Sequence, residues 1–129
     1  MIKLLAILLS SLLLCSSAFG QEAIPCSKYS FGGLAGTVQT VKSSTAILCG
    51  YHILNTSGAT CYLQMFDTAA TPTLGTTVPD QSLGFPSGSA ANVSAVQPGV
   101  SFLTALKLAG TTTRTGSTPC TLDVNIWYK

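Results

Sequence analysis

The sequence predicts an all-β protein, an antiparallel β-sandwich of jelly-roll type with about seven to eight strands after a cleaved signal peptide. Apolar and polar residues alternate with a period of two in nearly every segment after residue 36, and no helical period is found there. Glycine-, proline- and threonine-rich breaks separate these segments. With 129 residues and neither an internal repeat nor a linker, the chain has room for one domain.

Residues 1–20 have the three parts of a secretory signal peptide, namely a positively charged start, an apolar run and a group of small residues. Cleavage would leave Gln21 as the first mature residue, and a cut after Ala18 is the alternative. A lipoprotein signal acylated on Cys15 is a second alternative, but Leu14 stands where a small residue is needed. The apolar run is too short for a stable membrane anchor, so we predict export to the periplasm or the exterior.

The remaining chain, residues 21–129, is predicted to be one β-sandwich domain. Only 8% of all residues are charged and the formal net charge is +2, with no basic run to neutralise phosphates, which argues against a nucleic-acid partner. Four cysteines remain after the signal: Cys26, Cys49, Cys61 and Cys120. An even number in a small exported domain predicts two disulfides.

The expected elements follow one another as short strands and loops. They are an irregular N-terminal segment (21–36), a strand (37–43), a hairpin (46–66), a long loop (67–79), two short strands (80–85 and 90–96), a turn (97–99), a longer strand (100–109), a loop (110–119) and a final strand (121–129).

The hairpin is the centre of this prediction. The runs A-I-L-C-G-Y-H-I-L and A-T-C-Y-L-Q-M-F flank the loop N-T-S-G, which would pair Leu54 with Ala59 and His52 with Cys61. Alternation then places His52 and Leu54 on the same side as Leu48. The opposite side would carry Ile47, Cys49, Tyr51, Ile53, Tyr62 and Phe66. Both sides are apolar, so we expect the hairpin in the middle of the sandwich.

The hairpin register also constrains the disulfides. Cys49 would lie opposite Gln64, on the other face from Cys61, so a Cys49–Cys61 bridge has poor geometry. Two pairings remain open, in which Cys26 bonds to Cys49 or to Cys61 and Cys120 bonds to the cysteine left over.

The final strand carries the one tryptophan. Its alternation turns Leu122, Val124, Ile126 and Tyr128 inward, and Asp123, Asn125 and Trp127 outward. An outward tryptophan stacks on a sugar or fills a pocket in a neighbouring subunit, unless a second sheet or a loop covers it. We therefore single out Trp127, with Tyr51 and Tyr62, as candidate contacts to a ligand or partner.

No catalytic or metal-binding constellation stands out. His52 is the only histidine and is interpreted as a residue on a sandwich face, with a Cys61–His52 dyad as the alternative. Asp67 and Asp80 bracket one loop and are interpreted as turn formers rather than as ligands of a cation. We predict no metal, no cofactor and no enzymatic activity.

An ordered series of motifs extends from residue 37 to residue 129. They read T-V-Q-T-V-K-S-S, C-G-Y-H-I-L-N, C-Y-L-Q-M-F-D, P-T-L-G-T-T-V-P, G-F-P-S-G-S-A-A-N-V-S, T-A-L-K-L-A-G-T-T-T-R-T-G-S and V-N-I-W-Y-K. The series resembles a family of small proteins encoded mainly in phages and prophages, usually taken to be virion-associated. The resemblance implies a compact β-sandwich and supplies no catalytic residues. The export signal and the cysteines depart from the family and indicate an exported relative.

The preferred functional hypothesis is a non-enzymatic exported module of decoration or adhesion type, located on a virion surface or free outside the cell. It would act through a protein partner or by self-association, using hydroxyl-rich faces and edge strands. The alternative is a secreted carbohydrate-binding module that uses Trp127 with Tyr51 or Tyr62. A small hydrolase is the third and weakest hypothesis.

Overall fold

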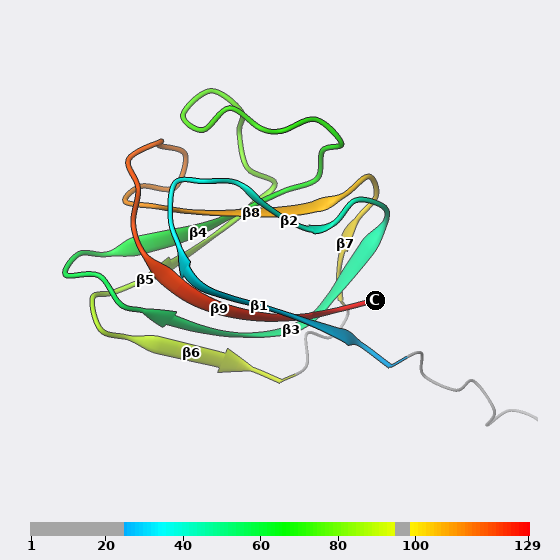
Figure 1. The fold of residues 1–129 in the computed structure, drawn as a ribbon, viewed down its shortest axis with the longest axis horizontal. Coiled ribbons are helices and arrows are strands. Elements are labelled where there is room, and N and C mark those ends of the chain that lie inside the picture. The colour runs from blue at the N-terminus through cyan, green and yellow to red at the C-terminus, as the bar shows by residue number, and fades with distance from the viewer. Residues whose placement is uncertain (1–24, 95–98) are drawn as a thin grey trace, which may run out of the picture.

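The structure, a computed structural model, describes residues 25–94 and 99–129. The described residues form two antiparallel sheets packed face to face, which confirms the predicted all-β sandwich (Figure 1). The predicted signal peptide, its cleavage site and most of the turn at 97–99 lie outside the described residues. The strands are β1 (Ser27–Leu34), β2 (Gln39–Lys42), β3 (Ala46–Asn55), β4 (Cys61–Phe66), β5 (Gln81–Phe85), β6 (Ala90–Val93), β7 (Val100–Phe102), β8 (Leu106–Thr111) and β9 (Leu122–Tyr128).

The strand order has the nested pattern of a jelly roll. Sheet A has the order β1-β9-β3-β6, with β7 also paired to β3, and sheet B has the order β2-β8-β4-β5. The innermost pair is β4 with β5, then β3 with β6 and β7, then β2 with β8, and the outermost pair is β1 with β9. The chain is therefore one long double-stranded ribbon, rolled up so that successive pairs fall in alternate sheets.

The hairpin predicted over residues 46–66 is wrong. Strands β3 and β4 lie in different sheets, and β4 instead pairs with β5 and β8. The chain crosses between the sheets just after Asn55, whose side chain is 1% exposed. Its Nδ2 group donates to the carbonyls of Ala59 (2.8 Å), Phe85 (2.8 Å) and Pro86 (3.0 Å). These bonds attach the connection between β3 and β4 to the end of β5. The Asn-Thr-Ser-Gly segment is therefore an arch, which joins strands of two different sheets, and not a hairpin turn.

The N-terminal segment predicted to be irregular contains strand β1, which pairs with β9 at the edge of sheet A. Tyr29 and Phe31 alternate inward and pack against the core. The glycines that indicated a loop belong to an irregularity of this strand, where the register shifts between Phe31 and Leu34 and Gly33 has a φ of 72°. Such a bulge takes glycine without breaking the strand.

A second bulge changes the predicted faces of β3. The register with β9 shifts between Leu48 and Gly50, so Cys49 is an extra residue in the strand. The extra residue reverses the inward and outward alternation of side chains that follow it. Leu48 and Ile53 therefore both point into the core, and His52 points to the outer side. The predicted grouping of His52 and Leu54 with Leu48 is therefore wrong, whereas the predicted inward and outward residues of β9 agree with their burial.

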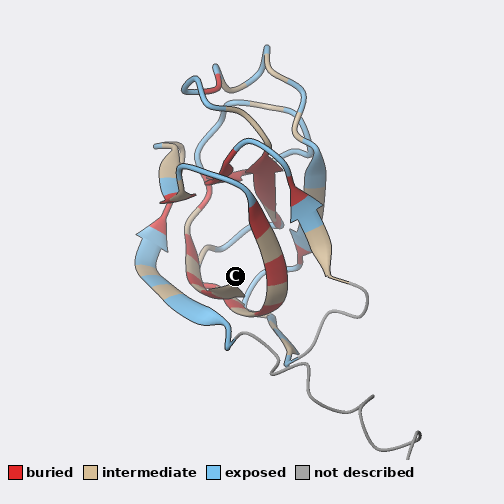
Figure 2. Ribbon diagram, turned by 90° about the vertical axis from the view of Figure 1, so that its right-hand side faces the viewer, coloured by how far each residue is buried: buried red, intermediate tan, exposed pale blue. Residues whose placement is uncertain are grey.

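The core lies between the two sheets (Figure 2). Its largest fully buried apolar side chains come from strands of both sheets: Leu34, Ile53, Phe102, Leu63, Met65, Leu106, Leu108, Leu122, Val124 and Ile126. The predicted strand 100–109 is split here into β7 and β8 by residues 103–105.

The outer face of sheet B is covered by the protein's own loops. Gln64, Phe66 and Lys107 point away from the core by their strand register, yet all three are buried. Lys107 Nζ donates to the carbonyls of residues 69 and 70 at 2.6 and 2.8 Å. Gln64 Nε2 donates to the carbonyls of residues 113 and 116 at 3.2 and 3.1 Å. The long loop after β4 and the loop after β8 thus cover this part of the outer face of sheet B.

Candidate binding face

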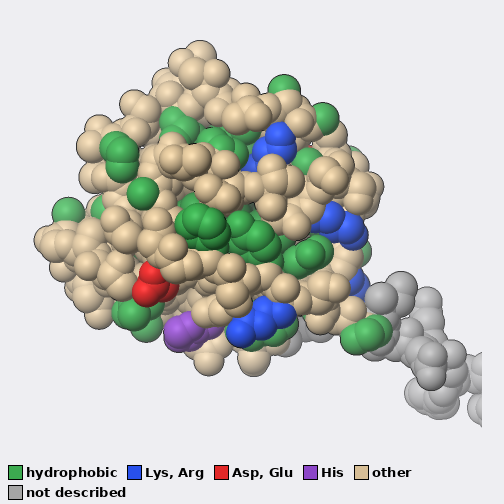
Figure 3. Space-filling model, viewed as in Figure 1, with side chains coloured by type: hydrophobic (Ala, Val, Ile, Leu, Met, Phe, Trp, Pro, Cys, Tyr) green, Lys and Arg blue, Asp and Glu red, His purple; other side chains and the backbone are tan. Residues whose placement is uncertain are grey.

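The outer face of sheet A has no such cover within the described residues. The side chains that project from it, which we call the open face, are Lys28, Ser30, His52, Leu54, Asn92, Asp123, Asn125 and Trp127. All of them are exposed or partly exposed. The lower side of the molecule in Figure 3, where sheet A lies, carries acidic, histidine and basic side chains next to one another.

A row of polar side chains crosses four strands of this face. Ser30 of β1 pairs with Asn125 of β9, which pairs with His52 of β3, which in turn pairs with Asn92 of β6. Ser30 Oγ donates to Asn125 Oδ1 at 2.7 Å. Among the described residues this bond is the only one in the row, so the Asn125 amide N–H groups and the side chains of His52 and Asn92 are available to a ligand.

Trp127 stands next to this row, one alternation along β9. Its register partners are Lys28 on β1 and Gly50 on β3. The Lys28 ammonium lies 5.9 Å from the centre of the indole ring, a cation–π distance. On the other side Gly50 contributes no side chain, and the backbone of Val93 and Ser94 occupies the place where its Cβ would be.

On the other side of the row, a hollow of about 300 Å³ opens between β1 and β9. It is lined by Ser30, Phe31, Gly32, Asp123, Val124 and Asn125. Gly33 N donates to Asp123 Oδ1 at 2.7 Å, which fixes the carboxylate at the rim. A side chain at Gly32 would begin 3.7 Å from that oxygen, so glycine keeps the hollow open.

The Cys26–Cys49 disulfide holds the strands of the open face together. The residue after Cys26 and the residue before Cys49 both pair with Tyr128, from opposite sides of β9. The bond therefore links β1 to β3 across the end of β9, close to Trp127. A face built on three strands fixed in this way is preorganised for binding.

The structure does not bring the three predicted contact residues together. Trp127 lies on the open face, as predicted. Tyr51 points between the sheets, where with Leu48, Met65 and Leu83 it lines an apolar cavity of about 230 Å³. Tyr62 lies on the outer side of sheet B, with its ring against Gly84. Trp127, Tyr51 and Tyr62 therefore cannot contact one ligand at the same time.

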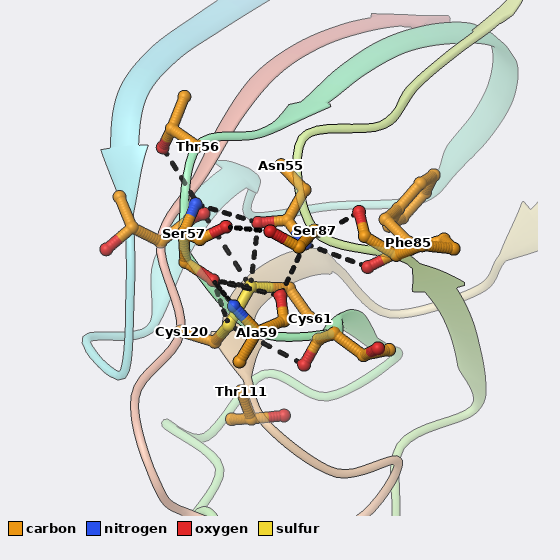
Figure 4. The surroundings of a disulfide bond; sticks show 12 residues. Asn55, Thr56, Ser57, Ala59, Cys61, Phe85, Ser87, Thr111 and Cys120 are labelled. Carbon is orange, nitrogen blue, oxygen red and sulfur yellow. Dashed lines mark hydrogen bonds between the residues drawn. A yellow bond between two sulfur atoms is a disulfide. The ribbon is translucent and has the colours of Figure 1, made fainter.

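The second disulfide joins Cys61 to Cys120 and is buried in the interior (Figure 4). Ser57 Oγ lies 3.1 Å from both sulfur atoms. The pairing is thus Cys26–Cys49 with Cys61–Cys120, one of the two left open by the sequence. The exclusion of Cys49–Cys61 was correct, although the hairpin on which it was based does not exist. Because Cys61 is oxidised and His52 lies on the open face of the other sheet, the Cys61–His52 dyad is ruled out.

Asp67 and Asp80 serve the loops, as the interpretation as turn formers predicted. The Asp67 carboxylate accepts backbone N–H bonds from Leu103 (2.6 Å), Thr104 (2.6 Å) and Ala105 (3.1 Å). Desolvation raises the pKa of Asp67, but these bonds outweigh it and hold the pKa below 3.8. Asp80 Oδ2 accepts the N–H of Asp67. Within residues 25–94 and 99–129, no group of three or more His, Cys, Asp or Glu side chains has the geometry to hold a metal ion.

The part of the open face on β9 is predictable from the sequence, whereas the part on the neighbouring strands is not. The alternation of the last strand had already turned Asp123, Asn125 and Trp127 outward. Ser30 was missed because its strand was interpreted as irregular, and His52 because a bulge cannot be seen from alternation alone. The signal that pointed to β1 was the alternation of Tyr29 and Phe31 before the glycines.

Comparisons with protein-family models, with curated proteins and with solved structures yield nothing that matches this chain. In the part of the chain that the structure describes, no helix has the length and apolar character needed to cross a membrane. The two disulfides are compatible with an oxidising, exported environment.

Proposed function

We propose that this protein is an exported, non-enzymatic binding module of adhesion or decoration type, which contacts its partner through the open face of sheet A. The observation that carries the proposal is the difference between the two outer faces. On sheet B the protein's own loops bury the polar side chains Gln64 and Lys107. On sheet A, Trp127 and a row of polar side chains remain accessible.

The chemistry of the open face supports binding rather than catalysis. A partly exposed tryptophan is one of the residues most enriched at the energetic centre of interfaces. Its neighbours donate and accept hydrogen bonds, yet His52 stands beside asparagines, with no nucleophile as its register partner. This arrangement favours recognition of a surface.

Two further observations support the assignment by analogy. Jelly rolls are common among virion and lectin domains, although a fold alone does not define a function. The motifs of the sequence resemble a phage and prophage family usually taken to be virion-associated. An exported relative of that family with two disulfide bonds would be stable on a particle or cell surface, where conditions are oxidising.

The first experiment measures binding of the purified mature protein to cell envelopes and to phage particles from the organism that produces it, by co-sedimentation. We expect Trp127→Ala to lose most of the binding. Leu103→Ala is the matched control, because Leu103 is a large side chain that is 74% exposed and lies outside the open face. Both variants are checked by circular dichroism for an unchanged fold.

The two surfaces separate the two roles. Retention on particles supports a decoration role, and retention on envelopes supports an adhesion role. If the wild-type protein binds neither surface, or if Trp127→Ala binds as well as Leu103→Ala does, the proposed function is wrong.

A further inference from the structure

The open face combines three kinds of groups along one strand. Asp123, Asn125 and Trp127 alternate outward on β9, so neighbouring members of the series are about 6.6 Å apart and the ends about 13 Å apart. A ligand that touches both ends must be elongated and must lie along the strand. It must also offer an apolar surface at one end and hydrogen-bonding groups at the other.

Trp127 provides the apolar end. Its ring is partly exposed, with the Lys28 ammonium on the β1 side and, on the β3 side, Gly50 and the backbone of Val93 and Ser94 that packs against it. A flat indole ring of this kind packs against flat ligand surfaces and keeps its N–H group free to donate. The C–H face of a sugar ring is such a surface.

The hollow between β1 and β9 provides the polar end. Its carboxylate accepts hydrogen bonds, and its amide donates them. Gly33 N occupies one oxygen of Asp123, and Ser30 occupies the carbonyl oxygen of Asn125. The second Asp123 oxygen and the Asn125 amide N–H groups have no protein partner among the described residues. A pair of neighbouring hydroxyl groups satisfies both kinds of atom at once.

The charges of the face select among hydroxyl-rich ligands. The hollow is lined by the carboxylate of Asp123 and by no lysine or arginine. A phosphate, sulfate or carboxylate entering it would be repelled and would lack a cationic partner. The lysine of the face lies beside Trp127, at the opposite end of the series.

We propose that the open face binds an uncharged glycan along β9, with one sugar stacked on Trp127 and the adjacent hydroxyls of another bound by Asp123 and Asn125. This inference rests on the proposed function and names its ligand class. His52 and Asn92 extend the polar row sideways and contact substituents that branch from the chain.

The test compares envelopes and particles that have been treated in two ways. Periodate oxidises adjacent hydroxyls, the groups assigned to Asp123 and Asn125, whereas proteinase removes surface proteins. We expect periodate to abolish binding of the wild-type protein and proteinase to leave it intact. Binding that survives periodate overturns the glycan ligand while the proposed binding function stands. Absence of binding to untreated surfaces overturns the proposed function itself.

Two variants and one change of solvent sharpen the test. Asp123→Asn keeps an oxygen for the N–H of Gly33 but loses the charge, and we expect its affinity to fall by about tenfold or more. Trp127→Phe keeps an aromatic ring and should retain more binding than Trp127→Ala. Binding of an uncharged ligand should not weaken between low and high salt. Unchanged affinity of Asp123→Asn, or a steep loss with salt, refutes the proposed ligand.

Discussion

Removal of the buried disulfide should destabilise the protein more than removal of the disulfide at the open face. The Cys61–Cys120 bond closes a loop with a sequence separation of 59, and Cys26–Cys49 closes one of 23. The chain-entropy relation gives about 4.2 kcal/mol for the longer loop and about 3.4 kcal/mol for the shorter one. Loop length alone thus separates the two bonds by less than 1 kcal/mol.

Burial widens the difference. Cys61 is 0% and Cys120 5% exposed, whereas Cys26 is an exposed residue just before β1. Replacing two buried sulfur atoms by hydrogen removes packing worth roughly 1 kcal/mol or more. The total for Cys61→Ala/Cys120→Ala is therefore about 5 kcal/mol. For Cys26→Ala/Cys49→Ala it stays close to the loop term, at about 3 kcal/mol.

Urea denaturation followed by circular dichroism measures both values, with the slope of the transition as a check that the unfolded states are comparable. The two loops do not overlap in sequence, so their effects should add. Their sum of about 8 kcal/mol is comparable with the entire free energy of unfolding of an ordinary domain. We therefore expect the variant without both bonds to be largely unfolded. If Cys26→Ala/Cys49→Ala costs as much as Cys61→Ala/Cys120→Ala or more, the reasoning from loop length and burial is refuted.

Three other substitutions test the packing and the electrostatics. Asn55→Ala should lower the free energy of unfolding, measured by urea denaturation, by about 2–4 kcal/mol, because the carbonyls bound by the Asn55 amide lose their donor. Ser87→Ala is the control, since it removes an exposed hydrogen bond nearby, and a smaller loss for Asn55→Ala than for Ser87→Ala would contradict this. Gly110→Ala should lower the free energy of unfolding by more than about 3 kcal/mol, because the new Cβ would overlap the carbonyl oxygen of Cys120 and lie 2.8 Å from that of Leu34. Gly58→Ala is the control: its Cβ would meet nothing within 4 Å, so the stability should hardly change. The lowered pKa of Asp67 stabilises the fold above pH 3.8, and this contribution is lost as the pH falls through the lower native value. Melting temperatures measured across that acid range should therefore fall less in Asp67→Asn than in the wild-type protein, and equal slopes would argue against the assignment.

The sequence predicts the class of this fold better than its pairing. Period-two alternation depends only on which side of a strand is buried, so β9 and its faces were predicted correctly. Alternation does not depend on which strand is the neighbour. The apolar runs of β3 and β4 are adjacent in the chain and separated by turn-forming residues, and they look like a hairpin. What distinguishes an arch from a hairpin here is the set of carbonyls that Asn55 binds, and two of these come from the end of β5, distant in sequence.

The candidate site was predicted only as far as local periodicity extends. Asp123, Asn125 and Trp127 belong to one regular strand. Their neighbours in space come from β1 and β3, and both strands contain a bulge that shifts the phase of alternation. A bulge adds one residue and leaves no strong signal in composition, so the row from Ser30 to Asn92 becomes visible only when the strands are aligned in three dimensions.

The nested ribbon explains why the open face forms where it does. The loop after β4, at the inner end of the ribbon, and the loop after β8 fold back over sheet B, where they bury Lys107 and Gln64. Among the described residues, no comparable loop folds back over the outer face of sheet A, to which the outermost pair β1 and β9 belongs. Rolling then places β9 between β1 and β3, with strands on both sides and a disulfide across its end. In the described part of the chain, the strand that carries Trp127 thus has no loop over its outer side and is held from both edges. Rigidity with exposure is what a binding face requires, because a preorganised surface loses little conformational entropy when a ligand is bound.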